Sequence, residues 1–407
     1  MKTKFFLLSA LLFISFTFYS QGKFDSKKLE ELQQSLDSII APVRDKGIKI
    51  STKVVHADYN KNLFEYKPEE PMIPASITKL VICAAAFTLL GQDYNIPTVI
   101  YTDDNNFSDG IINGNIYIKG FGDPDFNSSD VKSLSDHLLK LKIREITGNI
   151  VADESYFDSD YYTLQNDFSG DTGPSYWPYV SGLCLDKGKS ASYAGSLLSS
   201  LLTSGGVTLG GSVIAGVTPK GSKEVVRISH SLFDVLANMC KESDNHSAIT
   251  IFKLVGAKQK SEPGSIEKGQ EAIEGFLTEL GVSRYSYDIL EGSGLTRYNK
   301  VNAEMYIKIL KSMYDDKFLF DYFMNTLSVT GKDGTLKNRM TGTSAEGNVF
   351  AKTGTLNGVS ALSGYVVDKD SEVLIFYIVM NSFGGNANSM RSVQDDFCVR
   401  LSVYSRQ

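Results

Sequence analysis

The stretch that most constrains this chain is a long apolar run, residues 80–90, which directly follows Pro74-Ala75-Ser76-Ile77-Thr78-Lys79. Hydrophobic residues recur in this run at steps of three and four, which predicts a buried helix. Pro74 lies just ahead of the helix and Ser76 stands where it begins, as is usual at a helix N-terminus. Ser76 and Lys79 are one helical turn apart, so their side chains should share one face.

This spacing can place a base beside a nucleophile. A serine hydroxyl becomes nucleophilic when a neighbouring base takes its proton, and a buried lysine can lose its own proton and serve as that base. Ser76 and Lys79 are therefore candidates for a catalytic pair. A helix cap followed by a solvated lysine gives the same short pattern, which recurs at Ser129/Lys132 and Ser265/Lys268. Two later motifs bear on the choice.

Composition excludes several classes of function. The chain has 407 residues, 42% hydrophobic and 22% charged, which indicates a soluble globular protein with more than one domain or a large insertion. A net charge of −6 gives no sign of nucleic-acid binding. No pair of histidines has the spacing of metal ligands, so we expect neither a catalytic metal nor another cofactor.

The N-terminus has the pattern of a secretory signal peptide. Lys2 and Lys4 precede an apolar run at 5–18, and polar sequence begins at Ser20. The run is too short to span a bilayer, so residues 1–20 are predicted to be removed on export. A retained membrane anchor is the alternative. We expect a periplasmic protein without stable membrane insertion, in which four widely spaced cysteines leave disulfide formation open.

The remaining patterns divide the chain into a body and an insertion. The body, residues 24–95 and 227–407, combines helix-period runs with strongly apolar strands at 362–367 and 373–380. From residue 96 to residue 226, short strands and turn signals predict an inserted smaller α+β domain with its own sheet. Its residues 207–217, with Gly210-Gly211 in the middle, are expected to form a hairpin.

Two further motifs could complete a site around Ser76. Ser243-Asp244-Asn245 lies within or beside a predicted helix, where Ser243 could relay a proton and Asn245 could hold the lysine and a substrate carbonyl. Lys352-Thr353-Gly354-Thr355 follows a strand-like run, and a strand edge beside the serine could pair with an extended peptide. The backbone N–H groups of Ser76 and Thr355 are then the natural pair for an oxyanion hole. Each motif alone is also compatible with an ordinary turn or strand end.

Together, the three motifs resemble the signature of penicillin-binding proteins and class A β-lactamases. Longer segments, at residues 291–299, 331–336 and 351–365, resemble the class C low-molecular-mass penicillin-binding proteins, the D-alanyl-D-alanine carboxypeptidase/endopeptidase family. The resemblance implies an α/β (α+β) fold: a β-lactamase/transpeptidase-like domain, with an antiparallel sheet flanked by helices, carrying the inserted domain. It also implies action on peptidoglycan stem peptides and acylation by β-lactams.

The resemblance also implies a role for each site residue. Ser76 is the acylated nucleophile, Lys79 its base, and Ser243 and Asn245 assist proton transfer and substrate placement. Lys352 and Thr353 engage the terminal carboxylate, with Gly354 allowing close approach. Arg297, Asp153 and Phe157 match family residues near the substrate. The chain departs from the family at Glu291, usually Asp, and in its length between the first two motifs, from which we expect the innermost inserted domain to be absent.

Two other functions fit the same motifs. A β-lactamase or esterase could share the fold, but the Glu-x-x-x-Asn pattern with which class A β-lactamases deacylate does not occur between Ser243 and Lys352. A non-catalytic penicillin-binding sensor would be expected to lack one catalytic group, whereas every motif here is complete. The sequence therefore favours a serine-type D-Ala-D-Ala carboxypeptidase or endopeptidase.

Overall fold

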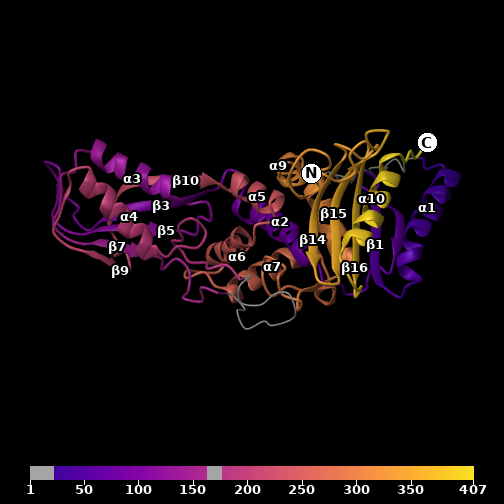
Figure 1. Cartoon of the computed structure of the whole chain (residues 1–407), viewed down its shortest axis with the longest axis horizontal. Helices are drawn as coiled ribbons and strands as arrows, with labels where there is room; N and C mark the ends of the chain where they lie inside the picture. Colours follow the sequence, from indigo (N-terminus) through magenta and orange to yellow (C-terminus); the bar gives the residue numbers. More distant parts are fainter. Residues whose placement is uncertain (1–22, 163–176) are drawn as a thin grey trace, which may run out of the picture.

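The computed structural model describes residues 23–162 and 177–407, so the predicted signal peptide lies outside the described residues. The described chain is elongated, with a large body at one end and a smaller module at the other (Figure 1). The body contains the chain on both sides of the module, and helices α2, α5, α6 and α7 lie between its sheet and the module (Figure 1).

The body is built on a six-stranded sheet. Its strand order is β13-β14-β15-β16-β1-β2, and every pair of neighbours is antiparallel. The central strands are almost wholly buried, as expected for a sheet covered on both faces. The strands are β1 (Lys49–His56), β2 (Lys61–Tyr66), β13 (Ser328–Val329), β14 (Val349–Leu356), β15 (Val359–Val367) and β16 (Val373–Asn381).

Two helical layers cover this sheet. α1 (Ser26–Arg44) and α10 (Asn388–Ser402) pack on one face with one hydrophobic core. The second core lies on the other face, where α2 (Thr78–Leu90) is buried on all sides from Thr78 to Phe87. The helices around it are α5 (Leu232–Lys241), α6 (Asn245–Gln259), α7 (Ile266–Glu279), α8 (Ala303–Asp315) and α9 (Phe320–Thr326).

The inserted module has a core of its own between two small sheets and two helices. A five-stranded sheet has the order β10-β3-β5-β7-β9, and a three-stranded parallel sheet has the order β4-β6-β8. Its elements are β3 (Asn95–Thr102), β4 (Ile111–Ile112), β5 (Ile116–Gly120), α3 (Ser128–Lys140), β6 (Glu145–Ile146), β7 (Ile150–Asp153), α4 (Ala191–Ser204), β8 (Thr208–Leu209), β9 (Val213–Ala215) and β10 (Lys223–Ser231).

The predicted hairpin at residues 207–217 is wrong. β8 pairs in parallel with β6, and β9 pairs in parallel with β7, so the two strands belong to different sheets. The glycines between them do not form a tight reversal. They let the chain cross closely over its neighbours, because a Cβ at Gly210 would lie 2.3 Å from the Thr147 carbonyl oxygen.

The module is joined to the body by apolar packing as well as by β3 and β10. Ile96, Tyr156, Phe157, Trp177 and Val180 belong to the same hydrophobic core as α2. All four cysteines are buried free thiols. None of the helices in the described ranges is long and apolar enough to cross a bilayer.

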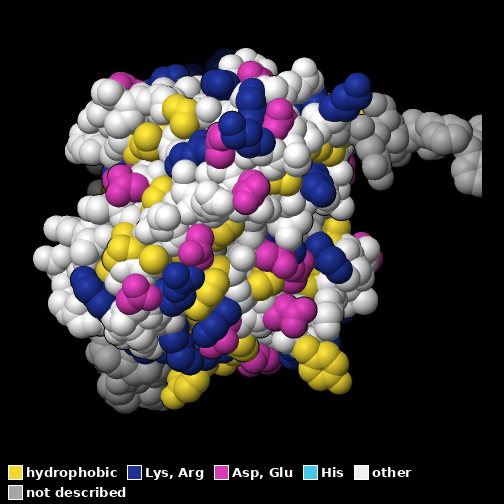
Figure 2. Space-filling view, turned by 90° about the vertical axis from the view of Figure 1, so that its right-hand side faces the viewer, with side chains coloured by type: hydrophobic (Ala, Val, Ile, Leu, Met, Phe, Trp, Pro, Cys, Tyr) yellow, Lys and Arg dark blue, Asp and Glu magenta, His cyan; other side chains and the backbone are white. Residues whose placement is uncertain are grey.

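The end of the body that carries α1 has a mixed surface. Figure 2 shows Lys and Arg side chains interspersed with Asp and Glu over this face, with hydrophobic side chains scattered between them. Such a surface is typical of a soluble domain.

Candidate active site

Ser76 lies in a 3₁₀ turn, Ala75–Ile77, that leads directly into α2. Neither the turn nor the helix has a side-chain cap, so the Ser76 hydroxyl is not used for capping. Instead, Lys79 Nζ donates a hydrogen bond to Ser76 Oγ at 3.1 Å. Ala75 has a φ of +50°, a strained conformation for a residue with a Cβ and one that is often found at functional sites. The predicted Ser–Lys pair is therefore formed.

The Lys79 amine is fully buried and held by three acceptors. Besides Ser76 Oγ, it donates to Asn245 Oδ1 at 2.8 Å and to the Ser293 carbonyl oxygen at 2.7 Å. Burial lowers the pKa of Lys79 to about 8, against the opposing charges of Glu291 and Asp244. About a tenth of this amine is therefore unprotonated at pH 7, far more than for a lysine with the ordinary pKa, and this form can act as a general base.

The Ser-x-x-Lys patterns at Ser265 and Ser129 are structural. Ser265 caps α7 by accepting from Lys268 N at 3.2 Å, while the Lys268 amine donates to backbone carbonyls. Ser129 donates to Asn127 on the module surface, and Lys132 pairs with Asp136. Only at Ser76, among the described copies of the pattern, does the amine reach the hydroxyl.

Ser243-Asp244-Asn245 lies at a sharp break between α5 and α6. Ser243 has a φ of +59°, which ends one helix and turns the chain into the next. Asp244 caps α6 by accepting from His246 N at 2.9 Å. Because of this break, Asn245 Oδ1 faces Lys79 and accepts a hydrogen bond from its amine. Ser243 Oγ faces Lys352 and accepts from the Lys352 amine at 2.9 Å. The motif is thus part of the site, although helical periodicity alone did not locate the break.

The inserted module contacts this break directly. Lys187, in the module, donates to Asp244 and lies 3.2 Å from Asp125 Oδ1. This pair keeps the pKa of the Asp244 carboxyl low despite burial. Asp244, which caps α6 and so orients the second motif, is therefore held in place by Lys187 of the module.

Lys352-Thr353-Gly354-Thr355 forms the middle of β14, beside the serine. A Cβ at Gly354 would lie 2.7 Å from the Pro74 carbonyl oxygen and 3.1 Å from Ser76 N, so glycine lets the strand approach the turn. β13 pairs only with Phe350 and Ala351, which leaves the next residues of β14 unpaired on that edge. This is the free strand edge that peptide pairing requires.

Lys352 is completely buried. Its amine donates to Ser243 Oγ and to the Thr353 carbonyl oxygen, each at 2.9 Å. Burial, and then repulsion from Lys79, lower the pKa of Lys352 to about 7. The lysine therefore links the second and third motifs inside the protein.

The loop between the short strands β11 (Tyr287–Asp288) and β12 (Lys300–Val301) supplies the Ser293 carbonyl oxygen that accepts a hydrogen bond from Lys79. The buried Glu291 carboxylate accepts from Ser293 N at 2.6 Å, from Ser293 Oγ at 2.5 Å and from Gly294 N at 2.8 Å. These bonds fix the Ser293 carbonyl that accepts from Lys79. The Glu found here in place of the family's usual Asp is therefore a structural anchor of the site.

Glu291→Ala should destabilise the protein by about 3 kcal/mol, because it leaves buried donors without an acceptor. Urea unfolding of the purified variant measures this. Glu224→Ala, which removes an exposed carboxylate paired with Arg227, is the matched control and should change the free energy of unfolding by less than about 0.5 kcal/mol. Equal stabilities of the two variants would contradict the anchoring role.

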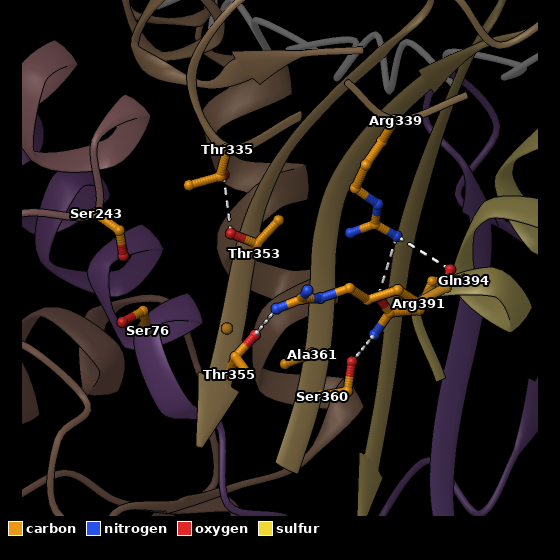
Figure 3. A pocket seen from close by; sticks show the side chains of 11 residues that line it. Ser76, Ser243, Thr335, Arg339, Thr353, Thr355, Ser360, Ala361, Arg391 and Gln394 are labelled. Atoms are coloured by element: carbon orange, nitrogen blue, oxygen red, sulfur yellow. Dashed lines mark hydrogen bonds between the residues drawn. The ribbon is translucent and has the colours of Figure 1, made fainter. Parts of the chain in front are cut away.

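A cavity of about 420 Å³ opens beside the motifs. Figure 3 shows Ser76 and Ser243 at one side, with β14 and β15 side chains along the floor. Thr353 Oγ1 donates to Thr335 Oγ1 at 2.8 Å. The lining residues are Ser76, Ser243, Thr335, Arg339, Thr353, Gly354, Thr355, Ser360, Ala361, Arg391 and Gln394.

Sequence reasoning did not single out six of these residues: Thr335, Arg339, Ser360, Ala361, Arg391 and Gln394. Thr335 follows Gly334 in the family-like segment 331–336, so the motif itself was a signal for it. Arg339 lies just outside that segment and carried no such signal. Arg391 carried none either, because nothing in the sequence indicated that α10 reaches the cavity. Arg391 comes from the first turns of α10 and extends over β15 to Thr355 (Figure 3).

Three predicted substrate-binding residues lie outside this cavity lining. Arg297 donates to the Asn357 carbonyl oxygen at 2.7 Å and lines a neighbouring hollow. Asp153 is buried in the module, where it accepts from Ser155 and Thr218 N. Phe157 is buried in the core that joins the module to the body. Substrate contact by these residues stays a prediction.

The arrangement can perform acyl transfer. The Ser76 hydroxyl contacts the partly unprotonated amine of Lys79, and the Ser243 hydroxyl accepts a hydrogen bond from the buried Lys352. The edge of β14 beside them is available to pair with a peptide. The backbone N–H groups of Ser76 and Thr355 belong to residues that line the same cavity, as an oxyanion hole requires. No cluster of metal-binding side chains occurs in residues 23–162 or 177–407.

Comparisons with known proteins agree with this chemistry. A D-alanyl-D-alanine carboxypeptidase of Actinomadura sp. (strain R39) is 27% identical over 466 aligned residues, covering 93% of this chain and 86% of the relative. The crystal structure of penicillin binding protein 4 from Haemophilus influenzae has a TM-score of 0.77 at 21% identity, covering 92% and 99% of the two chains. The complex of that protein with a β-lactam has a TM-score of 0.71 at 21% identity, covering 93% of this chain and 100% of that chain.

The structural likeness confirms the predicted fold class, whereas the absence of the inner domain stays a prediction. The model of the D-Ala-D-Ala carboxypeptidase 3 (S13) family matches residues 32–191 and 188–401, which is most of the chain. The chain therefore belongs to the D-Ala-D-Ala carboxypeptidase 3 (S13) family, and it is a serine-type D-Ala-D-Ala carboxypeptidase.

Proposed function

We propose that the enzyme cleaves peptidoglycan stem peptides through an acyl-enzyme on Ser76. The observation that carries this proposal is the 3.1 Å contact between Ser76 Oγ and the buried Lys79 amine. Unprotonated Lys79 takes the hydroxyl proton while Ser76 Oγ attacks the carbonyl carbon of the penultimate D-Ala. The N–H groups of Ser76 and Thr355 hold the negative oxygen that forms.

The second half of the reaction uses the same groups. The C–N bond breaks, and the proton passes from Lys79, through Ser243, to the leaving amine. Water, deprotonated by Lys79, then attacks the ester and restores the Ser76 hydroxyl. When the leaving amine belongs to a terminal D-Ala the enzyme acts as a carboxypeptidase, and when it belongs to a second stem peptide the enzyme acts as an endopeptidase.

Muropeptide digestion tests this proposal. Mass spectrometry of purified stem peptides incubated with the enzyme should record loss of one D-Ala, and cross-linked dimers should record conversion to monomers. If the correctly folded enzyme neither releases D-Ala nor converts dimers to monomers, the proposal is overturned and a penicillin-binding sensor is favoured.

β-Lactams should acylate Ser76, because they present a reactive carbonyl and a carboxylate in a similar arrangement. The cavity lining contains no Asp or Glu that could activate water against the resulting adduct. We therefore expect the adduct to persist. Following its lifetime by mass spectrometry separates the peptidase from a β-lactamase, which would lose the adduct within seconds.

The pH dependence of acylation follows from Lys79. Its unprotonated form is the base, so the rate constant at saturating β-lactam should rise with pH through about 8 and level off above that value. Rapid-mixing measurements between pH 6 and 9.5 would record this curve, and saturation separates it from effects of Lys352 on binding. A flat profile would exclude Lys79 as the base.

We also propose that the enzyme works outside the cytoplasm, in the periplasm. The charged and apolar pattern of residues 1–20 supports export. The mature protein isolated from the cell envelope should begin between Ser20 and Gly22, which N-terminal mass spectrometry can measure. Retention of residues 1–20 on the mature protein would contradict processing.

A further inference from the structure

The turn of the module that presents Lys187 is strained and firmly held. Asp186 and Lys187 have φ values of +50° and +56°, a conformation that is uncommon for residues with a Cβ and that accumulates at functional sites. Leu185 and Lys189 close the turn with two backbone hydrogen bonds, at 2.9 and 2.8 Å. The Asp186 carboxylate accepts from Ser128 N at 3.0 Å and from Ser128 Oγ at 2.7 Å. The module therefore fixes the position from which Lys187 extends.

A second turn of the module gives Lys187 a carboxylate partner. Asp125 Oδ1 lies 3.2 Å from the Lys187 amine and also accepts from Asn238 Nδ2, on α5, at 3.3 Å. Asp125 N donates to the carboxylate of the buried Asp123 at 3.1 Å, and that carboxylate is hydrogen-bonded to His230 at 2.7 Å. The lysine is thus held by carboxylate chemistry within the module as well as by its own turn.

From this position Lys187 reaches the break between α5 and α6. Its amine donates to Asp244 Oδ2, and the same carboxylate accepts from Ser247 Oγ at 2.8 Å and from His246 N at 2.9 Å. Burial would lower the pKa of Lys187, but the carboxylates of Asp244 and Asp125 outweigh it and raise that pKa. Lys187 therefore remains a cation at any pH near neutrality.

Asp244 stands between the two residues whose side chains enter the active site. Ser243 Oγ accepts from the Lys352 amine at 2.9 Å, and Asn245 Oδ1 accepts from the Lys79 amine at 2.8 Å. A displacement of Asp244 would disturb both contacts, and a misplacement of about 1 Å can cost about 100-fold in rate. Asp244 also acts through its charge, which opposes the effect of burial on the pKa of Lys79.

We propose that Lys187 is a positioning residue for acyl transfer, because it holds Asp244 and so keeps the flanking residues of the second motif aligned with the two buried lysines. Lys187 does not line the active-site cavity, so it acts through Asp244. The inference rests on the proposed function, since acylation of Ser76 is the reaction that Lys187 supports. It gives the inserted module a part in the chemistry, because the module supplies both the cation and the turn that presents it.

The rate constant of acylation by saturating benzylpenicillin tests this role. Lys187→Met should lower it about 10-fold at pH 7, because the contacts on both sides of Asp244 loosen. Asp244 still accepts from His246 N and Ser247 Oγ, so it stays ionised and its uncompensated charge raises the pKa of Lys79. The midpoint of the pH profile should therefore rise by about half a pH unit, which rapid mixing across that range measures.

Asp244→Asn should move the same midpoint in the opposite direction. Asparagine keeps the cap of α6 but removes a negative charge that raises the pKa of Lys79. The midpoint should therefore fall by about half a pH unit. Adding Lys187→Met to this variant should change the rate constant less than about twofold, because no carboxylate is left for the cation to hold. A general loosening of the fold does not produce shifts of opposite sign.

Two matched substitutions complete the series. Lys187→Arg keeps the cation and should retain the wild-type rate constant within about threefold. Lys189→Met removes an exposed lysine of the same turn, which pairs with Asp186, and should leave the rate constant and the midpoint at wild-type values. The other titratable groups facing Lys79, Asp244 or Lys187 are unchanged throughout the series. These groups are Asp125, Cys240, His246, Glu291 and Lys352.

An unchanged rate constant and midpoint in Lys187→Met would overturn the proposal, as would a Lys187→Arg variant no faster than Lys187→Met. Should Lys187→Met prove too unstable to purify, Asp244→Asn decides, and an unmoved midpoint there counts against the link.

Failure of the proposed function gives a different result, because the wild type is then not acylated at all. The link is in that case judged by carbon-13 NMR of the Lys79 side chain, which needs no activity. Its titration midpoint should rise in Lys187→Met and fall in Asp244→Asn, and equal midpoints in the wild type and both variants would overturn the positioning role.

Discussion

Ser76→Ala should abolish penicillin labelling and D-Ala release, with a loss of at least about 10,000-fold, while the protein remains folded. No other described hydroxyl contacts the Lys79 amine, so no alternative group is positioned to form the acyl-enzyme. The substitution removes one half-buried oxygen, and Lys79 keeps its bonds to Asn245 and Ser293. Fluorescent penicillin labelling and quantification of free D-Ala measure the two losses.

The control for this variant is Ser129→Ala. Ser129 also begins a Ser-x-x-Lys pattern, but its hydroxyl lies on the module surface. Its removal should leave labelling and D-Ala release at wild-type levels. The thermal midpoint of Ser76→Ala should lie within a few degrees of wild type, because the substitution should change the free energy of unfolding by about 1 kcal/mol or less. Persistent labelling of Ser76→Ala would assign the nucleophile elsewhere.

Lys79→Ala should slow acylation about 1,000-fold, because deprotonation of Ser76 is then unassisted. Truncation also leaves a cavity and two unpaired buried oxygens, Asn245 Oδ1 and the Ser293 carbonyl. Lys79→Met fills most of that volume, so it reports on the lost amine with less structural damage. Both variants should acylate slowly, and the slow rate should no longer rise through pH 8.

Lys132→Ala is the control for the lysine variants, since Lys132 occupies the same place in the surface copy of the pattern and pairs with Asp136. It should acylate at the wild-type rate. A normal acylation rate in Lys79→Met, with circular dichroism like that of wild type, would transfer the role of base to another group, with Ser243 the next to test.

The parts of the site that sequence predicted are those defined by short-range patterns. Ser76 and Lys79 lie one turn apart on one helix, so their contact follows from helical geometry alone. Asn245 and Lys352 are far from Ser76 in sequence, and only the resemblance to known motifs brought them into the same site. The contacts from Lys79 to Asn245 and from Lys352 to Ser243 confirm that they meet.

The parts that could not be predicted depend on tertiary packing. Arg391 reaches the cavity only because α10 packs across the sheet and the side chain extends over β15. The break at Ser243 depends on a positive φ, which helical periodicity does not reveal. The failure at residues 207–217 has the same origin: Gly210-Gly211 carries the chain from one sheet to another, and no local pattern distinguishes this from a hairpin.

The bridge from Lys187 to Asp244 has a practical consequence for anyone who wishes to shorten this enzyme. Excising residues 96–226 would remove the cation beside Asp244 and the side chains of Tyr156 and Trp177 that cover the α2 core. The remaining parts of the body would expose apolar surface to water, and the Ser243 turn would lose the contact between Lys187 and Asp244. We therefore expect the smallest active enzyme to retain the insertion, with trimming confined to regions remote from that junction.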